Sequence, residues 1–249
     1  MNVPAVRKRS EFWAGVVVFI VILAGLSAGT GWLYRLATDV EQTPFTEVVI
    51  AGERHYTTSK EVVDVLRQGV LGGFFTANAD ALRARVEGLP WVYSASIRRE
   101  WPGTLHVFVV EEAPLAIWNE SQLLNVHGDV FTAPVDDLKE SLPALFGPEE
   151  NVKEVLDYYQ RFQTLLAQEG YVIRGFYLSE RFATVLALDN GIELRLGRES
   201  QIERIQRFMD LLPVILAEQA EGELQRIEYI DLRYDTGLAV GWRETTTGE

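Results

Sequence analysis

The sequence predicts an α+β protein in which one membrane-spanning helix precedes two small mixed modules. Three observations support this prediction. Residues 12–34 carry no charged side chain. Beyond them, apolar residues recur with helical spacing in some segments and with a period of two in others. Apolar residues make up 47% of the 249 positions, which is ample for buried cores.

The uncharged stretch has the length and flanks of a membrane anchor. As a helix, residues 12–34 extend about 34 Å, and a bilayer core is about 30 Å thick. Phe12 and Trp13 lie at one end, and Trp32 and Tyr34 lie at the other, as in interfacial aromatic belts. Three basic residues precede the stretch, so the positive-inside rule places residues 1–11 in the cytoplasm as a short tail. We expect a linker over residues 35–44 and the rest of the chain outside the cytoplasm.

A cleavable signal peptide is the alternative interpretation of this stretch. Ser27, Ala28 and Gly29 are small residues that suit a cleavage site. However, the uncharged run continues through Tyr34, which is longer than a signal peptide requires. The excess length favours an uncleaved anchor.

Residues 45–113 predict a first module with the order β-α-α-β-β. Residues 45–52 form a β-branched strand, and Thr58 or Ser59 is suited to cap a helix that ends before Gly72. A second helix covers residues 77–87. Two strands at 91–100 and 104–112 follow, joined by Trp101-Pro102-Gly103.

Residues 114–244 predict a second α+β module with a mostly antiparallel sheet. Short strands are expected within 115–134, at 171–178, 183–188 and 192–196, with a helix over 152–168. Ser200 is suited to cap a further helix, which Pro213 should kink or shorten. Residues 245–249 form a C-terminal tail.

The second module closes on the stretch YIDLRYDTGLAVGW at residues 229–242. Alternation places Ile230, Leu232 and Tyr234 on one face of a strand, and the turn at 235–237 leads to a final strand from Leu238. A final strand is often an edge strand with unpaired backbone groups. Burial within the sheet is the alternative for these residues.

Charge and motif content exclude several function classes. A net charge of −13 disfavours nucleic-acid binding, and the absence of cysteine excludes thiol chemistry and Cys-ligated zinc. The three histidines are far apart in sequence. The adjacent acids Glu111-Glu112 and Asp136-Asp137 point to opposite faces of a strand, so neither pair predicts a catalytic dyad. We expect no catalytic residue, cofactor, metal or small-molecule substrate, and we interpret the chain as a binding protein.

Four segments resemble the FtsQ/DivIB family of bitopic bacterial division proteins. They are GERHYT at 52–57, LPWV at 89–92, IRREWPGTLHVFVVEEAPLAIWN at 97–119, and the closing segment at 229–242. The resemblance covers residues 12–244, and the motifs occur in the family's order. It implies that the first module is a POTRA domain and that the protein is an essential, non-catalytic divisome scaffold, linking early and late division proteins at the septum of the cell inner membrane.

The resemblance also implies partners and contact residues. The POTRA domain would serve recruitment by other divisome proteins, and the second module would bind FtsB, accompanied by FtsL, by strand addition to its last strand. The partner-binding residues carried over are Arg181, Arg233, Tyr234, Thr236, Gly237 and Trp242. The recruitment surface carried over is Ser94, Ile97 and Arg99, expected on one face of a strand. The family often has a second basic residue beside Arg181, where this chain has Phe182.

Two alternative functions remain at this stage. One is a POTRA-bearing adaptor for outer-membrane assembly or secretion, against which the N-terminal anchor and the absence of a barrel pattern argue. The other is an anchored cell-wall hydrolase that would depend on Glu111 or Glu112.

Overall fold

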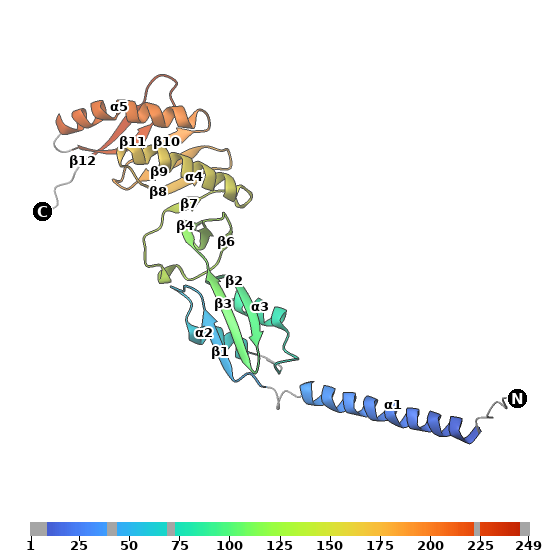
Figure 1. Cartoon of the computed structure of the whole chain (residues 1–249). Coiled ribbons are helices and arrows are strands. Elements are labelled where there is room, and N and C mark those ends of the chain that lie inside the picture. The colour runs from blue at the N-terminus through green and yellow to red at the C-terminus, as the bar shows by residue number, and fades with distance from the viewer. Residues whose placement is uncertain (1–8, 39–43, 69–72, 222–224, 245–249) are drawn as a thin grey trace. The chain divides into compact units, whose positions relative to one another are not determined.

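The computed structural model describes residues 9–38, 44–68, 73–221 and 225–244. The chain divides into two compact units, Met1–Glu111 and Glu112–Glu249 (Figure 1). The first unit contains the N-terminal helix and the three-stranded module, and the second contains a nine-stranded sheet with two long helices.

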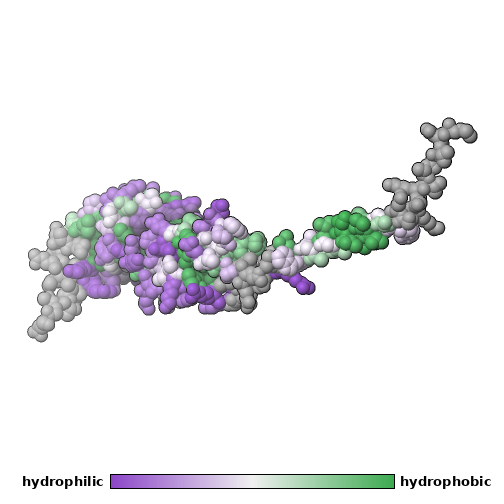
Figure 2. All heavy atoms as spheres, turned by 60° about the horizontal axis from the view of Figure 1, so that its bottom comes forward, coloured by the Kyte–Doolittle hydropathy of each residue, from purple (hydrophilic) through white to green (hydrophobic). Residues whose placement is uncertain are grey.

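Helix α1, Arg9–Thr38, is long and apolar enough to cross a membrane. Its segment Phe12–Arg35 has a mean hydropathy of 2.3, and its most apolar stretch is not buried by the rest of the described chain. Figure 2 shows this segment as a band of apolar side chains. The hydroxyls of Ser27 and Thr30 donate to main-chain oxygens one turn earlier at 2.9 Å. These hydroxyls therefore have a partner inside the helix, as a lipid environment requires.

The first module has the predicted order. Its elements are β1 (Glu47–Ala51), α2 (Ser59–Arg67), α3 (Ala79–Glu87), β2 (Val92–Glu100) and β3 (Thr104–Glu111). Strand β3 is central, parallel to β1 and antiparallel to β2, so β1 and β2 form the two edges. Of the two expected caps of α2, Thr58 is the one used: its hydroxyl accepts from Glu61 N at 3.2 Å, and the Glu61 carboxylate accepts from Thr58 N at 2.7 Å.

The two helices bury their apolar stripes against one face of this sheet. The core residues are Val62 and Leu66 of α2, Leu82 and Val86 of α3, and Leu105, Val107 and Val109 of β3. Each is at most 2% exposed. The spacing of three or four residues in the helices and of two in the strand is the pattern that predicted these elements.

The loop between β1 and α2 is fixed by a glycine and a carboxylate. Gly52 has φ +115°, and a Cβ there would lie 2.0 Å from the Val109 oxygen, so only glycine fits. The Glu111 carboxylate accepts backbone N–H groups from His55 at 2.5 Å, Tyr56 at 3.1 Å and Thr57 at 2.5 Å. The GERHYT segment is therefore a loop held by the end of β3.

The second module is built around one large sheet. Its strands are β4 (Pro114–Trp118), β5 (Gln122–Asn125), β6 (Val130–Phe131), β7 (Ala144–Phe146), β8 (Ile173–Leu178), β9 (Thr184–Leu188), β10 (Glu193–Gly197), β11 (Gln225–Asp231) and β12 (Ala239–Glu244). Its helices are α4 (Val152–Leu166) and α5 (Gln201–Glu221), and short 3₁₀ turns lie at Val135–Asp137, Glu149–Asn151 and Ala167–Glu169. The strand order is β12-β11-β10-β9-β8-β7-β4-β5-β6.

The sheet is mostly antiparallel, as predicted, with three parallel contacts: β4 with β7, β7 with β8, and β10 with β11. The last contact arises because α5 crosses over between β10 and β11 (Figure 1). Strand β7 was not predicted, because three residues are too few for a periodic signal. Helix α5 runs beyond Pro213 to Glu221, so Pro213 does not shorten the helix, which was one of the two expected effects.

Helices α4 and α5 contact each other, and they pack on β8 and on β10 and β11, respectively. The core between helices and sheet includes Phe162, Phe176 and Phe208, each at most 1% exposed. Ile230 and Leu232 belong to this core at 0% exposure. The strand pair β11 and β12 is therefore anchored on the core of the module.

Candidate partner-binding site

Strand β12 is the outermost strand at one end of the large sheet. It pairs antiparallel with β11, with Ala239 opposite Asp231, Gly241 opposite Tyr229 and Trp242 opposite Ile227. Within the described part of the chain, β12 pairs with no other strand. Its outer edge therefore offers backbone donors and acceptors for another segment, and the predicted edge strand is confirmed.

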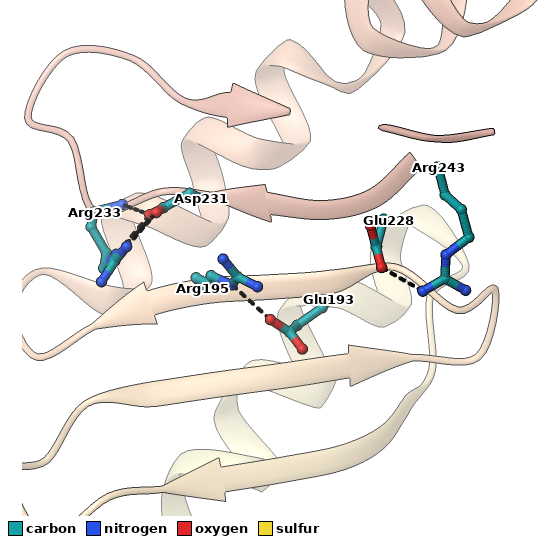
Figure 3. Close-up of polar contacts among 6 residues, drawn as sticks. All are labelled: Glu193, Arg195, Glu228, Asp231, Arg233 and Arg243. Atoms are coloured by element: carbon teal, nitrogen blue, oxygen red, sulfur yellow. Dashed lines mark hydrogen bonds and ion pairs between the residues drawn. The ribbon is translucent and has the colours of Figure 1, made fainter. Parts of the chain in front are cut away.

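Strand β11 ends at Asp231, earlier than the alternation predicted. The Asp231 carboxylate accepts from Arg233 N at 3.0 Å and pairs with the Arg233 guanidinium at 2.6 Å (Figure 3). An aspartate that binds the backbone two residues later favours a turn over a continued strand. Tyr234 consequently lies in the connection between β11 and β12 with 58% of its surface exposed.

Two arginines of α5 hold this connection through its carbonyl groups. Arg204 Nη2 donates to the Arg233 oxygen at 3.2 Å. Arg207 Nη1 donates to the oxygens of Tyr234 at 2.6 Å and Gly237 at 3.2 Å. Sequence analysis did not identify Arg204 and Arg207 as site residues. Their spacing of three residues places them on one face of a helix, which was the available signal.

The expected contact residues of the connection and of β12 differ in exposure. Thr236 is exposed, whereas Gly237 is half-buried. Trp242 is partly buried and packs against the core of the module. It therefore supports β12 from within, and a charged residue at position 242 should also disturb the fold.

On the other face of the strand pair, the Tyr229 ring lies between Gly241 and the Arg195 guanidinium. The Tyr229 ring occupies the space beside Gly241, where a Cβ would lie 2.2 Å from the ring. The Arg195 guanidinium carbon lies 3.9 Å from the centroid of the same ring. Arg195 also pairs with Glu193 at 2.7 Å, and Arg243 pairs with Glu228 (Figure 3). These contacts hold β10, β11 and β12 together, and β12 is the strand with the unpaired outer edge.

A basic groove of about 520 Å³ adjoins the start of the connection. Its lining residues are Ser179, Arg181, Ala183, Gly197, Arg198, Glu199, Arg204 and Arg233. The structure thus brings together Arg181 and Arg233, which are far apart in sequence. Gly197 has φ +71°, and a Cβ there would lie 2.9 Å from Arg204 Nη1 and 3.2 Å from Arg233 Cγ. The positive φ favours glycine at this corner, and the two arginine side chains lie close beside it.

The four arginines of the groove differ in whether they form hydrogen bonds or ion pairs within the protein. Arg233 is paired with Asp231, and Arg204 donates to the Leu196 oxygen at 2.5 Å. Arg181 and Arg198 are exposed, and neither has a hydrogen bond or ion pair to a described residue. Two guanidinium groups are thus available to carboxylates of another molecule.

The hydrogen bonds from Arg233 also act on Asp231. They lower the pKa of the Asp231 carboxyl below its usual value, and this effect outweighs burial, which acts in the opposite direction. Asp231 is 5% exposed, so its charge is present and compensated inside the fold at neutral pH. The start of the connection is therefore held by the Asp231–Arg233 ion pair, and Arg181 and Arg198, which make no ion pair with a described residue, lie in the same groove.

The three expected recruitment residues do not share one face of β2. Ser94 lies opposite Val110, which is 41% exposed. Ile97 and Arg99 lie opposite buried Val107 and Leu105, toward the helices. Strand residues of even and odd number point to opposite faces, so the single-face expectation was wrong.

Ile97 and Arg99 also have contacts inside the module. Ile97 packs against the module's core. Arg99 Nη1 donates to the Phe74 oxygen at 3.0 Å and lies 3.4 Å from the Ala77 oxygen. These contacts tie β2 to the segment before α3.

The adjacent acids Glu111 and Glu112 bind different groups. Glu111 accepts the backbone amides described above, whereas Glu112 accepts from the buried Asn125 side chain at 2.9 Å. The two carboxylates therefore have separate hydrogen-bond partners, each within its own unit. In the described ranges, no cluster of three histidine, aspartate or glutamate side chains is arranged to hold a metal ion.

Both modules match known families. Residues 43–112 match the POTRA domain, FtsQ-type, and residues 116–233 match the family described as Cell division protein FtsQ/DivIB, C-terminal. Curated relatives named Cell division protein FtsQ include one from Shewanella oneidensis, which is 41% identical over 95% of this chain and 88% of its own length.

The chain belongs to the FtsQ/DivIB family. FtsQ of Aliivibrio fischeri is 40% identical over 95% of this chain and 91% of its own length, and FtsQ of Escherichia coli is 35% identical over 97% and 88%, respectively. The protein is therefore a cell division protein with a POTRA domain, and the resemblance stated from its motifs is confirmed. The family match of the second module ends at Arg233, so the remainder of the connection and β12 lie beyond it.

Proposed function

We propose that this FtsQ/DivIB protein is a non-catalytic scaffold of the division complex that binds FtsB, together with FtsL, by strand addition to β12. The observation that carries the proposal is the unpaired outer edge of β12 in the described sheet. The connection that leads into β12 starts at a groove where two arginines, Arg181 and Arg198, make no ion pair with a described residue. Backbone hydrogen bonds along an edge supply affinity, and side chains flanking it supply specificity.

Charge supports an acidic partner segment at the groove. The chain as a whole carries −13, so a local cluster of Arg181, Arg198, Arg204 and Arg233 is a departure from its general character. A partner with carboxylates next to an extended apolar segment fits this arrangement. The carboxylates would meet Arg181 and the exposed part of the Arg233 guanidinium, with Arg198 in the same groove. The extended segment would continue along β12 beside Tyr234 and Thr236.

The proposed topology follows from α1. Residues 1–11 lie in the cytoplasm, α1 crosses the inner membrane once, and both modules lie in the periplasm, at the septum during division. Recruitment by other divisome proteins is proposed to use β2, which is an edge strand of the POTRA sheet and carries Ser94, Ile97 and Arg99.

A pull-down of FtsB tests the partner and the site together. Tyr234→Asp and Arg181→Glu change exposed side chains, so both should lower FtsB recovery at least tenfold while the circular dichroism spectrum stays unchanged. Lys153→Glu, an exposed charge reversal on α4 away from the groove, is the matched control and should bind normally. Normal recovery with both site variants would refute the proposed site.

Trp242→Asp tests whether Trp242 supports β12 by packing on the core of the module. Because Trp242 packs on the core, we expect this variant to lose FtsB and also to lower the thermal midpoint. Loss of binding without a change in midpoint would mean that Trp242 contacts the partner directly.

The role in division and the absence of catalysis have separate tests. Depletion of the protein should produce filamentous cells, and normal septation would contradict the proposal. Cell-wall turnover by the purified protein that is lost in Glu111→Gln or Glu112→Gln would establish a hydrolase instead. Co-purification with outer-membrane barrels, without division proteins, would establish an assembly adaptor.

A further inference from the structure

One end of the POTRA module exposes large aromatic side chains. Trp101, at the tip of the β2–β3 hairpin, is 75% exposed, and Phe75, before α3, is 55% exposed. Phe74 joins them, with ring centroids 5.1 Å from Phe75 and 6.0 Å from Phe45. We refer to Phe45, Phe74, Phe75 and Trp101 as the aromatic end.

Backbone contacts place these residues at the same end of the sheet. Thr46 N donates to the Gly103 oxygen at 2.9 Å, so the hairpin tip adjoins the start of β1 (Figure 1). Arg99, just before the tip, donates to the Phe74 oxygen at 3.0 Å. The hairpin tip, the start of β1 and the segment before α3 therefore form one continuous end of the module.

The aromatic end is also the end joined to the membrane helix. Helix α1 ends at Thr38, and the POTRA core begins with Phe45. Six Cα–Cα steps separate Thr38 from Pro44, which at full extension reach roughly 20 Å. The chain therefore holds the aromatic end close to the bilayer surface, at an effective concentration in the millimolar range.

We propose that the aromatic end of the POTRA module rests on the outer surface of the membrane, with Trp101 and Phe75 in the headgroup region of the lipid. This inference rests on the proposed membrane topology of α1. Tryptophan and phenylalanine gain from leaving water, and the indole N–H of tryptophan retains polar partners at the lipid interface. Because the tether already restricts the module, a shallow contact by two side chains suffices.

The charges at this end limit the depth of the contact. Glu47 begins β1, and Glu100, beside Trp101, contacts His106 at 2.9 Å. Exposed acids do not enter hydrocarbon, so the contact stops at the headgroups. Arg98 and Arg99 lie beside these acids and provide cations for lipid phosphates.

The chain has no cysteine, so a single nitroxide label can be placed at will. The probe is the full chain in nanodiscs of equal parts phosphatidylethanolamine and phosphatidylglycerol, labelled at Glu100→Cys. The control label is at Glu53→Cys, whose native side chain is 89% exposed at the opposite end of the sheet. Collisional relaxation by oxygen and by a water-soluble nickel chelate reports the depth of each label.

We expect the label at position 100 to be several-fold less accessible to the nickel chelate than the label at position 53. Trp101→Ser combined with Phe75→Ser should return it to the level of position 53. Both side chains are exposed, so the fold and FtsB recovery should be unaffected. Equal accessibility of the two labels, or no effect of the double variant, would overturn the inference without affecting the strand-addition proposal. Failure of the chain to enter nanodiscs would overturn the proposed topology as well.

Discussion

The guanidinium of Arg233 lies on the carboxylate of Asp231, with Nη2 2.6 Å from Oδ2 and Nε 2.9 Å from Oδ1 (Figure 3). This contact ends β11, begins the connection to β12 and orients Arg233, which also lines the groove. Asp231 is almost fully buried, whereas the Arg233 side chain is 60% exposed. The carboxylate therefore acts as a fixed anchor, and the guanidinium can still meet a partner.

Asp231→Asn should destabilise the second module by about 1–2 kcal/mol, because the buried carboxylate that accepts hydrogen bonds from Arg233 loses its charge. The effect is modest because the Arg233 guanidinium is partly solvated. Urea unfolding of the full chain in detergent, followed by circular dichroism at neutral pH, measures the difference. Glu199→Gln, a neutral replacement of an exposed acid in the same groove, is the control and should change little.

The contribution of Asp231 should depend on pH in a defined direction. Its pKa is lowered in the folded state by hydrogen bonds from Arg233. The stabilisation is therefore fully present above the unfolded-state pKa, about 3.9, and is lost as the pH falls through the lower folded-state value. The difference between wild type and Asp231→Asn should shrink below about pH 4, and a constant difference at lower pH would contradict this assignment.

Glu111→Gln should loosen the loop before α2, whereas Glu112→Gln should not. Burial opposes ionisation of Glu111, but the amide donors from His55, Thr57 and Tyr56 outweigh it and keep the pKa low. Loss of the charge should cost about 1–3 kcal/mol in the POTRA module. Amide hydrogen exchange at residues 55–57 measures it directly. Glutamine at position 112 can still accept from Asn125, so equal effects of the two variants would refute the assignment.

The sequence predicted most elements of both modules, strand β7 excepted, because periodicity and caps are local signals. It missed a pairing of distant strands and a turn within an alternating stretch. The parallel contact between β10 and β11 follows from the crossover of α5, and the early end of β11 follows from the side chain of Asp231. Of the residues carried over from the family, Arg181 and Arg233 line one groove beside the connection. Arg207 was missed because its function is to bind carbonyl oxygens of a connection that no residue pattern identifies.

Gly52→Ala should destabilise the POTRA module by at least about 2–3 kcal/mol. The backbone at Gly52 has φ +115°, which a residue with a Cβ rarely adopts, and the added atom would lie 2.0 Å from the Val109 oxygen. Gly237→Ala is the contrast, since a Cβ there meets no atom within 4 Å. Thermal unfolding should show a lower midpoint for the first variant alone, and equal midpoints would contradict the assignment.

Arg207→Ala should weaken FtsB binding without removing any residue that is proposed to touch FtsB. Arg207 holds the oxygens of Tyr234 and Gly237, so its loss should leave Tyr234 in a wider range of positions. Ordering that segment on binding then costs additional free energy, about 1 kcal/mol, which corresponds to a several-fold rise in Kd. Faster hydrogen exchange at residues 233–237 in the free protein should accompany the weaker binding. Arg161→Ala on α4, which removes an exposed pair with Asp157, is the matched control. Weaker binding with unchanged exchange would mean that Arg207 contacts the partner itself.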